Sequence, residues 1–524
     1  MSRTIKHTHS RAGRRHRHGA ILVGIATAAV LLTGCSGGGS TEPTTSAEAS
    51  IDTEAVLRFG AARPLTSADP RVSTSLSDYA FLYFMYDRLM TYDPETGEVL
   101  PELAHAWEFD DSGTALRIEL EPDLKFQDGT TLDAEAVAYS LNSYKSIGIH
   151  GDLDVVESIE VLSPTDLVLH LSRVDVSLPS VLADRAGMIV SPTAAEELGD
   201  GFATAPVGAG PYTFTSQVAG ASIKLERSSE YWKGTPDLAG VDITFYADDT
   251  AMLAAARSGQ LDVAVQVQPA NVEVSRSIPG IRVEQNGSLS VGSMFLNTDA
   301  PPFDDQNVRL ALNYAMDRDA IVAGASEGLG EPAYGPFPQS HLFGTPADAF
   351  PYDPDKARDL LKDSKYSDIS ATCTTVTASG LDRMAAIVAA QAKDVGVDIT
   401  LDVREPAVAA EMIRSGEVPC FISTVTVAAD PGAALNLLFS PDGTYNYGHN
   451  EHPELESLLA TVASTIDPDA RADAIQSAVD EVTALAPNVS LYLLPRFDLV
   501  SDRVLGWAPQ FQGRVNYGDL VLTK

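Results

Sequence analysis

The segment from Pro101 to Asn142 reads PELAHAWEFDDSGTALRIELEPDLKFQDGTTLDAEAVAYSLN and carries the clearest local pattern of this 524-residue chain. Apolar and charged residues alternate from Leu116 to Leu120, which predicts a half-buried strand. Asp128-Gly129 is a turn pair. Asp133 occupies an N-cap position ahead of an apolar run with helical spacing. The segment therefore predicts two short strands, a polar turn and a capped helix, as in an α+β subdomain.

Strands and helices alternate along the rest of the chain without internal repeats. Residues 56–61 predict a first strand, and residues 77–90 predict a helix that is rich in aromatic residues. Residues 369–427 predict a strand–helix–strand–helix–strand series. Strands separated by helices of about 10–15 residues are typical of βαβ units, so this part predicts a parallel sheet.

Four further motifs, taken together with residues 101–142, resemble one known family. Residues 206–212 read PVGAGPY, similar to the family's Val-Gly-Thr-Gly-Pro-Tyr element with Ala209 in place of threonine. Residues 230–234 (EYWKG) and 258–262 (SGQLD) resemble two more of its elements. Residues 301–317 (PPFDDQNVRLALNYAMD) match its Pro-Pro-Phe-x-Asp-x-x-Val-Arg-x-Ala-Leu-x-Tyr-Ala-x-Asp pattern. The chain resembles the family 5 extracellular solute-binding proteins, the peptide and nickel receptors of ABC importers, over nearly all of its length.

This resemblance implies an α/β fold with two lobes, of the periplasmic-binding-protein type II, and an inserted subdomain in the first lobe. The first lobe would comprise residues 51–290 and 496–524, with the insertion near residues 91–206. The second lobe would comprise residues 291–495. Ligand would lie between the lobes, which would close over it, and the resemblance implies neither catalysis nor a cofactor.

Residues 1–34 predict an export signal. Six basic residues and no acidic residue precede an apolar run from Ala20 to Leu32, which is the layout of a secretory signal and is too short to cross about 30 Å of hydrocarbon. Leu32-Thr33-Gly34-Cys35 resembles a bacterial lipobox, which implies cleavage before Cys35 and lipidation of this residue. The alternative is an ordinary signal peptide with an incidental cysteine. Residues 35–50 predict a flexible tether, and Arg14-Arg15 is a weak hint of twin-arginine export.

The composition is strongly acidic. The formal net charge is −36, and it becomes −42 when the six basic residues of the signal are removed. Such a charge disfavours nucleic acid and anionic lipid as binding partners. A soluble surface that repels its own copies explains the charge without any role in steering a ligand, and it is consistent with the monomer that we expect.

Cys373 and Cys420 remain as a pair once Cys35 is assigned to the lipid. Both lie in predicted strands, and disulfides persist in exported proteins. A bridge would close a loop of roughly 47 residues and stabilise the fold by about 3–4 kcal/mol. The alternative is two buried thiols that pack as small hydrophobic groups. Neither cysteine has the spacing of a zinc ligand.

Three loops are candidates for holding a ligand, because clefts in α/β proteins form at the carboxyl ends of strands. The first loop leads into the helix predicted at residue 77, where amides and hydroxyls would face outward. The second leaves the strand at residues 420–427, and the third offers aromatic rings and an amide. For each loop a plain surface turn is the alternative, and for Asp78 a helix N-cap. The candidate residues are Ser77, Asp78, Tyr79, Thr424, Thr426, Val427, Asp430, Tyr445, Asn446 and Tyr447.

Position 427 departs from the family pattern. The resemblance places an aspartate four residues before the loop's proline in dipeptide and oligopeptide receptors, where it pairs with the ligand's α-ammonium group. Here that position is Val427, and Asp430, directly before Pro431, favours a turn. A buried ammonium without a carboxylate is costly, so either another acid such as Asp78 serves, or the ligand presents no amino terminus there. Gly432 weakens a nickel-chelate interpretation, in which a histidine would lie near this loop.

Two short motifs match catalytic or metal patterns without the required context. Gly324–Gly328 has the G-x-S-x-G spacing of a hydrolase nucleophile, but it follows a predicted helix instead of a strand, so no catalytic role is expected for Ser326. His449 and His452 are three residues apart, yet no third metal ligand can be assigned. We therefore expect no metal site.

The sequence thus predicts a lipid-anchored receptor on the outer face of the cell membrane, or on the periplasmic side where an outer membrane exists. It would capture a solute, in the first place a peptide or peptide-like compound, and deliver it to an ABC permease. Ligand contacts made by both lobes would shift the protein from an open to a closed form. The alternatives are a receptor for another solute, such as a metal chelate or an oligosaccharide, and a component that presents its ligand to a sensor.

Overall fold

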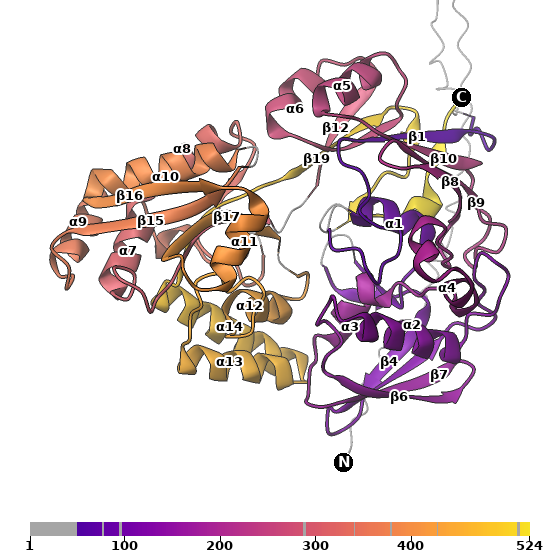
Figure 1. Ribbon diagram of the computed structural model, residues 1–524, viewed down its shortest axis with the longest axis horizontal. Helices are drawn as coiled ribbons and strands as arrows, with labels where there is room; N and C mark the ends of the chain where they lie inside the picture. Colours follow the sequence, from indigo (N-terminus) through magenta and orange to yellow (C-terminus); the bar gives the residue numbers. More distant parts are fainter. Residues whose placement is uncertain are drawn as a thin grey trace, which may run out of the picture.

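The computed structural model describes residues 50–75, 78–93, 97–286, 290–339, 341–377, 380–426, 428–510 and 514–524. Two lobes lie side by side, and each is built on its own large sheet (Figure 1). The predicted α/β class is confirmed. Cys35, Ser77 and Val427 lie outside the described residues.

The first lobe is built on a seven-stranded sheet with the strand order β12-β19-β11-β1-β10-β9-β8. Its central strand β1 pairs in parallel with both neighbours, β10 and β11. The rings of Phe81 and Phe84 from helix α1 pack edge-on against Phe59 of β1. The strands are β1 (Val56–Ala61), β8 (Tyr212–Val218), β9 (Ser222–Arg227), β10 (Gly240–Phe245), β11 (Val263–Val267), β12 (Ile281–Asn286) and β19 (Arg496–Ser501). The helices are α1 (Tyr79–Met85), α4 (Pro192–Leu198), α5 (Asp249–Arg257) and α6 (Pro269–Ser275).

A separate four-stranded antiparallel sheet, β4-β5-β7-β6, forms a subdomain of this lobe. Leu116 and Ile118 of β5 are fully buried, opposite Leu169 and Leu167 of β7. The Asp133 carboxylate accepts a hydrogen bond from the amide of Ala136 and caps α2. The strands, turn and capped helix predicted for residues 101–142 are therefore confirmed. The elements are β2 (Met90–Tyr92), β3 (Val99–Pro101), β4 (Ala104–Phe109), β5 (Ala115–Leu120), α2 (Ala134–Ile147), β6 (Val156–Ser163), β7 (Asp166–Leu171) and α3 (Leu178–Leu182).

The second lobe is built on a six-stranded sheet with the order β14-β18-β13-β17-β15-β16. Strand β15 pairs in parallel with β16 and with β17, as the alternating pattern of residues 369–427 predicts. The strands are β13 (Ser290–Leu296), β14 (Glu331–Pro332), β15 (Ile369–Val376), β16 (Val397–Arg404), β17 (Cys420–Thr426) and β18 (Asn488–Leu493). The helices are α7 (Gln306–Ala315), α8 (Arg318–Ala325), α9 (Pro354–Lys362), α10 (Leu381–Val395), α11 (Pro406–Arg414), α12 (Pro431–Phe439), α13 (Pro453–Ser464) and α14 (Pro468–Leu485).

The chain passes between the two large sheets twice. It leaves the first sheet at the end of β12 and enters the second at β13, and it returns from β18 to β19 through Leu494 and Pro495 alone. After β19, the tail stays in the first lobe, where Tyr517 stacks on Phe84 with ring centroids 3.6 Å apart. Short strand pairs complete this tail: β20 (Val504–Leu505) with β23 (Val521–Leu522), and β21 (Pro509–Gln510) with β22 (Arg514–Val515).

One helix is shorter than predicted. The aromatic pattern predicts a helix over residues 77–90, but α1 ends at Met85, and Tyr86 has an extended backbone with φ −132° and ψ 126°. The glycine turn that precedes β8 lies against this point, because the amide of Gly210 donates to the carbonyl of Met85 at 2.9 Å. The Tyr86 hydroxyl donates to the carbonyl of Ala68. Residues on all sides of the segment are buried, so the apolar pattern could not reveal where the helix ends.

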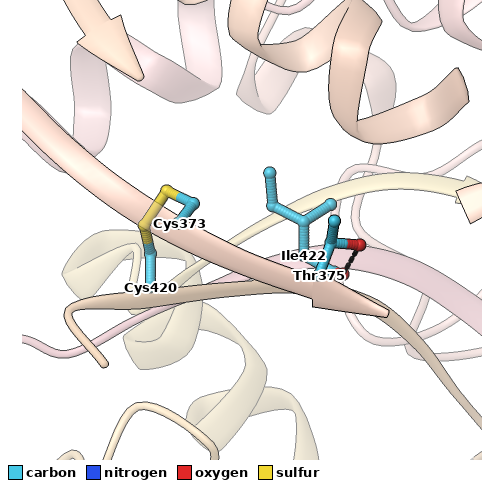
Figure 2. The surroundings of a disulfide bond; sticks show 4 residues. All are labelled: Cys373, Thr375, Cys420 and Ile422. Carbon is cyan, nitrogen blue, oxygen red and sulfur yellow. Dashed lines mark hydrogen bonds between the residues drawn. A yellow bond between two sulfur atoms is a disulfide. The ribbon is translucent and has the colours of Figure 1, made fainter. Parts of the chain in front are cut away.

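A disulfide joins Cys373 of β15 to Cys420 of β17 in the core of the second lobe (Figure 2). The two residues are register partners on neighbouring parallel strands, with their Cα atoms 4.7 Å apart. Two residues further along β15, the Thr375 hydroxyl donates to the carbonyl of Ile422 at 2.9 Å, which ties the same strands together beside the sulfur atoms.

A buried ionic cluster joins the subdomain to the first sheet. Glu102 pairs with Arg88 at 2.9 Å and with Lys233 at 3.1 Å. Asp87 accepts a hydrogen bond from the Trp232 indole at 2.7 Å and lies 3.5 Å from Lys233. Burial raises the pKa of Asp87 to about 6, since the attraction of Lys233 is insufficient to offset it and Glu102 adds repulsion. The folded protein therefore binds the Asp87 proton more tightly than the unfolded chain does.

We expect Asp87 to make the protein less stable as the pH rises. Its folded pKa lies above its usual value, so its contribution is complete below about pH 4 and is lost as the pH passes about 6, a change of up to about 3 kcal/mol. In the Asp87→Asn variant, the thermal unfolding midpoint should depend less on pH between pH 4 and 7. Glu157→Gln, at an exposed acid of β6, should retain the wild-type slope. An Asp87→Asn variant with the wild-type slope would contradict this assignment.

Candidate ligand-binding site

The lobes touch along one edge in this structure. The amide of Val176, in the subdomain, donates to the carbonyl of Ala463 near the end of α13 at 3.0 Å. Ala429, between β17 and α12, is buried among the apolar side chains of the subdomain. Figure 1 shows α13 beside the subdomain and the two large sheets further apart. Ala429, just before α12, therefore packs against the first lobe.

In the first lobe, aromatic and cationic side chains from α1 and from the segment after α3 form a stack. Tyr79 and Tyr83, one turn apart on α1, have parallel rings with centroids 5.5 Å apart. The guanidinium carbon of Arg88 lies 4.3 Å from the Tyr83 ring centroid, and that of Arg185 lies 5.0 Å from the Tyr79 ring centroid. Arg185 begins a short 3₁₀ turn, Arg185–Gly187, just after α3. The stack brings together residues about 100 positions apart in the chain.

His150 and Tyr144 lie next to this stack. Their rings are stacked with centroids 5.2 Å apart, and the Tyr144 hydroxyl donates to the exposed carboxylate of Asp152 at 2.8 Å. Burial lowers the pKa of His150, and the positive charge of Arg185 lowers it further. His150 is therefore held in its neutral form over a wider pH range than a free histidine.

The second-lobe side contributes Tyr445 and Tyr447. Tyr447 packs edge-on against Phe295 and Phe421 at ring-centroid distances of 5.1 and 5.3 Å, so it belongs to the core of its own lobe. Tyr445 packs edge-on against Tyr447 and lies in the loop after α12. Burial raises the pKa of Tyr445, while the charge of Arg185 lowers it.

The predicted site residue Asp78 and its loop neighbour Ser73 are directed inward. Asp78 is 1% exposed, and its carboxylate accepts hydrogen bonds from the Thr66 amide at 3.1 Å, the Thr66 hydroxyl, and the Ser73 hydroxyl at 2.7 Å. It makes no side-chain capping bond to α1. The prediction that the hydroxyls of this loop face outward is wrong for Ser73, which is completely buried. The Asp78 carboxylate therefore holds Thr66 and Ser73 to the start of α1.

Polar residues of the second-lobe loops also have internal partners. Asp430 accepts two hydrogen bonds from Arg471 at 2.7 Å each and caps α12 through the Ala433 amide. The Asn446 side chain bonds to three backbone groups, the carbonyls of Ser440 and Asn450 and the amide of Asn450. The Thr426 hydroxyl is bonded to that of Ser290, and Thr424 is half-buried on β17. Of the predicted residues, Tyr79 and Tyr445 instead lie in aromatic clusters, Tyr79 against Tyr83 and Arg185 and Tyr445 against Tyr447.

Sequence reasoning missed Arg185 and His150. A usable signal for Arg185 was present, since it is the single cation in LPSVLADRAGMIVSP (residues 178–192), an otherwise mostly apolar segment. A cation at such a position is buried only with a partner or for a function. His150 follows the end of α2 and carries no local signal, because only the fold brings it near Arg185.

The catalytic and metal motifs have structural roles. Ser326 is completely buried after α8, and its hydroxyl donates to the carbonyl of Val322 at 2.9 Å. His449 bonds to the carbonyl of Ile413, and His452 lies 3.3 Å from the Thr298 hydroxyl. Within the described residues, no group of three or more His, Cys, Asp or Glu side chains is placed to hold a metal ion. Among the helices described, none combines the length and the apolar character that a membrane crossing requires.

Comparisons with known proteins agree with this architecture. The family model described as "Bacterial extracellular solute-binding proteins, family 5 Middle" matches residues 98–446. The glutathione-binding protein GsiB of Pectobacterium atrosepticum is 26% identical over 460 residues, covering 84% of this chain and 88% of that protein.

Two solved structures show the same fold. The ABC transporter substrate-binding protein CtaP of Listeria monocytogenes superposes with a TM-score of 0.80 at 20% identity, covering 90% of this chain and 100% of that one. The periplasmic binding protein DppA of Helicobacter pylori, in complex with the peptide STSA, superposes with a TM-score of 0.76 at 22% identity, covering 90% and 98%. With its two lobes and with the family model matched over most of its length, this chain belongs to the bacterial extracellular solute-binding proteins of family 5.

Proposed function

We propose that this protein binds a peptide-type solute between its lobes and delivers it to the permease of an ABC importer. Tyr79 and Arg185 of the first lobe and Tyr445 of the second lobe form the core of the site. The lobes correspond to residues 51–290 with 496–524, and to residues 291–495, with the subdomain near 91–206. The name of the relative GsiB, a glutathione-binding protein, supports a peptide-type ligand over the other solute classes.

One observation carries this proposal. The two lobes have separate hydrophobic cores and touch along one edge, where the amide of Val176 in the subdomain donates to the carbonyl of Ala463 in the second lobe. Only two chain passages connect these lobes, and one of them consists of just Leu494 and Pro495. A solute that contacts both walls is held fully only when the lobes are together, so its binding favours the closed arrangement.

We expect peptides to stabilise the protein against heat. Pooled peptides of two to six residues, at about 100 times the dissociation constant, should stabilise it by about 2.7 kcal/mol, which raises the unfolding midpoint by a few degrees. Tyr445→Ala should weaken this shift. Tyr352→Ala removes an exposed tyrosine of the second lobe, 55% exposed, and should retain it. No shift with any pool would contradict a peptide-type ligand.

The N-terminal segment supports a membrane anchor for this receptor. Cleavage before Cys35 and lipidation of its thiol and amino group would tether the lobes through residues 36–50 to the outer face of the membrane. Labelling with radioactive palmitate should mark the wild-type protein in the membrane fraction. Cys35→Ser should be unlabelled and should leave that fraction, whereas label on the variant would contradict the anchor.

A further inference from the structure

The edge where the lobes touch contains side-chain contacts beside the backbone bond from Val176 to Ala463. Gly113 lies in the turn between β4 and β5 and is buried. A Cβ atom at this glycine would lie 2.9 Å from Cγ1 of Val174 and 3.0 Å from Cδ1 of Ile466. Val174 belongs to the subdomain, and Ile466 lies between α13 and α14 of the second lobe. The two side chains therefore cover Gly113 from opposite lobes.

The first-lobe half of this contact is fixed by its own turn. Gly113 has φ +73°, a left-handed conformation that suits glycine. Its amide donates to the carbonyl of Asp110 at 3.0 Å, and the Asp110 carboxylate accepts the amide of Thr114 at 3.0 Å. The carbonyl of Thr114 accepts the amide of Leu171 at 2.8 Å. The turn is thus joined to the strand that leads to Val174.

Arg471, in the first turn of α14, fixes the second-lobe half. It donates two hydrogen bonds of 2.7 Å to Asp430 at the start of α12, and its Nε donates to the carbonyl of Val462 in α13 at 3.2 Å. Ala429, directly before Asp430, is 5% exposed and belongs to the apolar cluster of the subdomain. One arginine therefore holds three helices together, and the contacts of Ala429 and Ile466 with the first lobe both lie on this unit.

The contact lies far from the chain passages that connect the lobes. Figure 1 shows β12 and β19 near the top of the boundary and α13 beside the subdomain at the bottom. When two bodies rotate about a hinge, points on them separate in proportion to their distance from it. Opening of the lobes therefore breaks this contact early, and its free energy stabilises the closed form alone.

No part of the contact requires a solute. It consists of a backbone hydrogen bond and of apolar groups that are stabilised by leaving water. Ile466 is still 44% exposed, so the area that it buries is small compared with that of a core residue. Such a contact is strong enough to bias the lobes toward closure and weak enough to open without unfolding.

We propose that this contact is a latch that keeps the lobes mainly closed before any solute binds. The latch consists of the residues that meet across the edge, Gly113, Val174, Val176, Ala463 and Ile466. Solute then enters through a minor open form, and the latch sets how much of the empty protein is closed. Because the latch acts without solute, it stands whether or not the solute is a peptide.

Hydrogen exchange at the Val176 amide tests the latch in the full chain without solute. This amide donates across the lobe boundary, so it is protected while the lobes are together and exposed when they part. Mass spectrometry with residue-level fragmentation should find exchange at least about tenfold slower than in an unstructured peptide of the same sequence. Exchange at the unstructured rate would overturn the proposal.

Ile466→Ser should make the Val176 amide exchange about fivefold faster, because a half-buried apolar side chain is lost from the closed form. Val403→Ser is the matched control. It removes an apolar side chain that is 48% exposed on β16, the outer strand of the second sheet, and should exchange as the wild type does. The amides of β5 and β15 should stay protected in both variants, which shows that each lobe remains folded.

Two glycines of the subdomain provide a second matched pair. Gly113 and Gly129 have φ +73° and +81°, so alanine introduces similar backbone strain at each. A Cβ atom at Gly129 meets no atom within 4 Å, whereas one at Gly113 must push Val174 and Ile466 aside. Gly113→Ala should therefore speed exchange at Val176, and Gly129→Ala should not.

The outcomes are distinct from those of the peptide experiment. Unchanged exchange in Ile466→Ser, or equal exchange in Gly113→Ala and Gly129→Ala, would overturn the latch even if peptides bind. If no peptide pool shifts the midpoint, the peptide-type function fails, and exchange at Val176 still decides the latch. With a pool that binds, Ile466→Ser should need more peptide by no more than its factor in exchange, since the apparent dissociation constant follows the closed fraction. A much larger loss would overturn the latch in favour of direct contact between Ile466 and the solute.

Discussion

Replacing Arg318 with methionine is expected to destabilise the second lobe by about 5 kcal/mol. Arg318 is 2% exposed at the start of α8. Its Nε donates to the carbonyls of Ala333 and Ser490 at 2.8 and 2.9 Å, and its Nη1 donates to the carbonyl of Asn313 at 3.0 Å. Methionine supplies no donor, so three carbonyls from separate parts of the lobe would lose this partner.

The tryptophans allow the effect to be assigned to one lobe. All three, Trp107, Trp232 and Trp507, lie outside residues 291–495. Tryptophan fluorescence therefore reports unfolding of the first lobe, while far-ultraviolet circular dichroism reports both. We expect Arg318→Met to create an early urea transition in circular dichroism that fluorescence does not follow. Proteins with several domains commonly unfold in such separate steps.

Arg383→Met is the matched control for this prediction. Arg383 lies on α10 of the same lobe, and its exposed side chain pairs with Glu327 at the surface. Surface pairs contribute about 1 kcal/mol or less, so this variant should unfold like the wild type. Unfolding of Arg318→Met at the wild-type urea concentration, in both signals, would show that these carbonyls find other donors.

Loss of the disulfide is expected to cost the second lobe about 4 kcal/mol, because the Cys373–Cys420 bridge closes a long loop and restricts the unfolded chain. The residues it joins are 47 positions apart. Reduction of the wild-type protein tests the cross-link alone, since both sulfur atoms stay in the core. The circular dichroism transition should move to lower urea concentration, and the fluorescence transition should move less.

The double variant Cys373→Ala, Cys420→Ala completes this experiment. It should be at least as unstable as the reduced wild type, since it also removes two buried sulfur atoms, and a reducing agent should not change it further. A thiol assay on the denatured, unreduced wild-type protein should detect no free thiol from these positions. Two free thiols together with no effect of reduction would favour the alternative of unbridged, buried cysteines.

Secondary structure was predictable where the signal lies within a short segment. Residues 101–142 form the strands, turn and capped helix that their pattern predicts, because alternation and an N-cap act over a few residues. The parallel pairing of β15 with β16 and β17 followed from the spacing of strands and helices. The end of α1 was not predictable, because the Gly210 turn that meets Met85 lies more than 100 residues away.

The candidate site was only partly predictable for the same reason. Tyr79 and Tyr445 were identified from loops expected at strand ends; Tyr79 packs against Arg185 in the first lobe, and Tyr445 packs against Tyr447 in the second. Asp78 and Asp430 came from the same reasoning, but their carboxylates are bonded within their own lobes. Composition shows that an acid is present, but only packing shows whether its oxygens are already satisfied.

Local chemistry in the chain was therefore sufficient for the family and for the alternation of strands and helices, since each depends on neighbouring residues. Tertiary structure alone showed which buried charges are paired. Arg71 and Arg185 are both buried arginines, yet the first pairs with Asp69 two residues away, while no carboxylate of the described residues forms an ion pair with the second. Burial and pairing depend on how distant segments pack, so whether a buried arginine has an acidic partner is decided only in the folded protein.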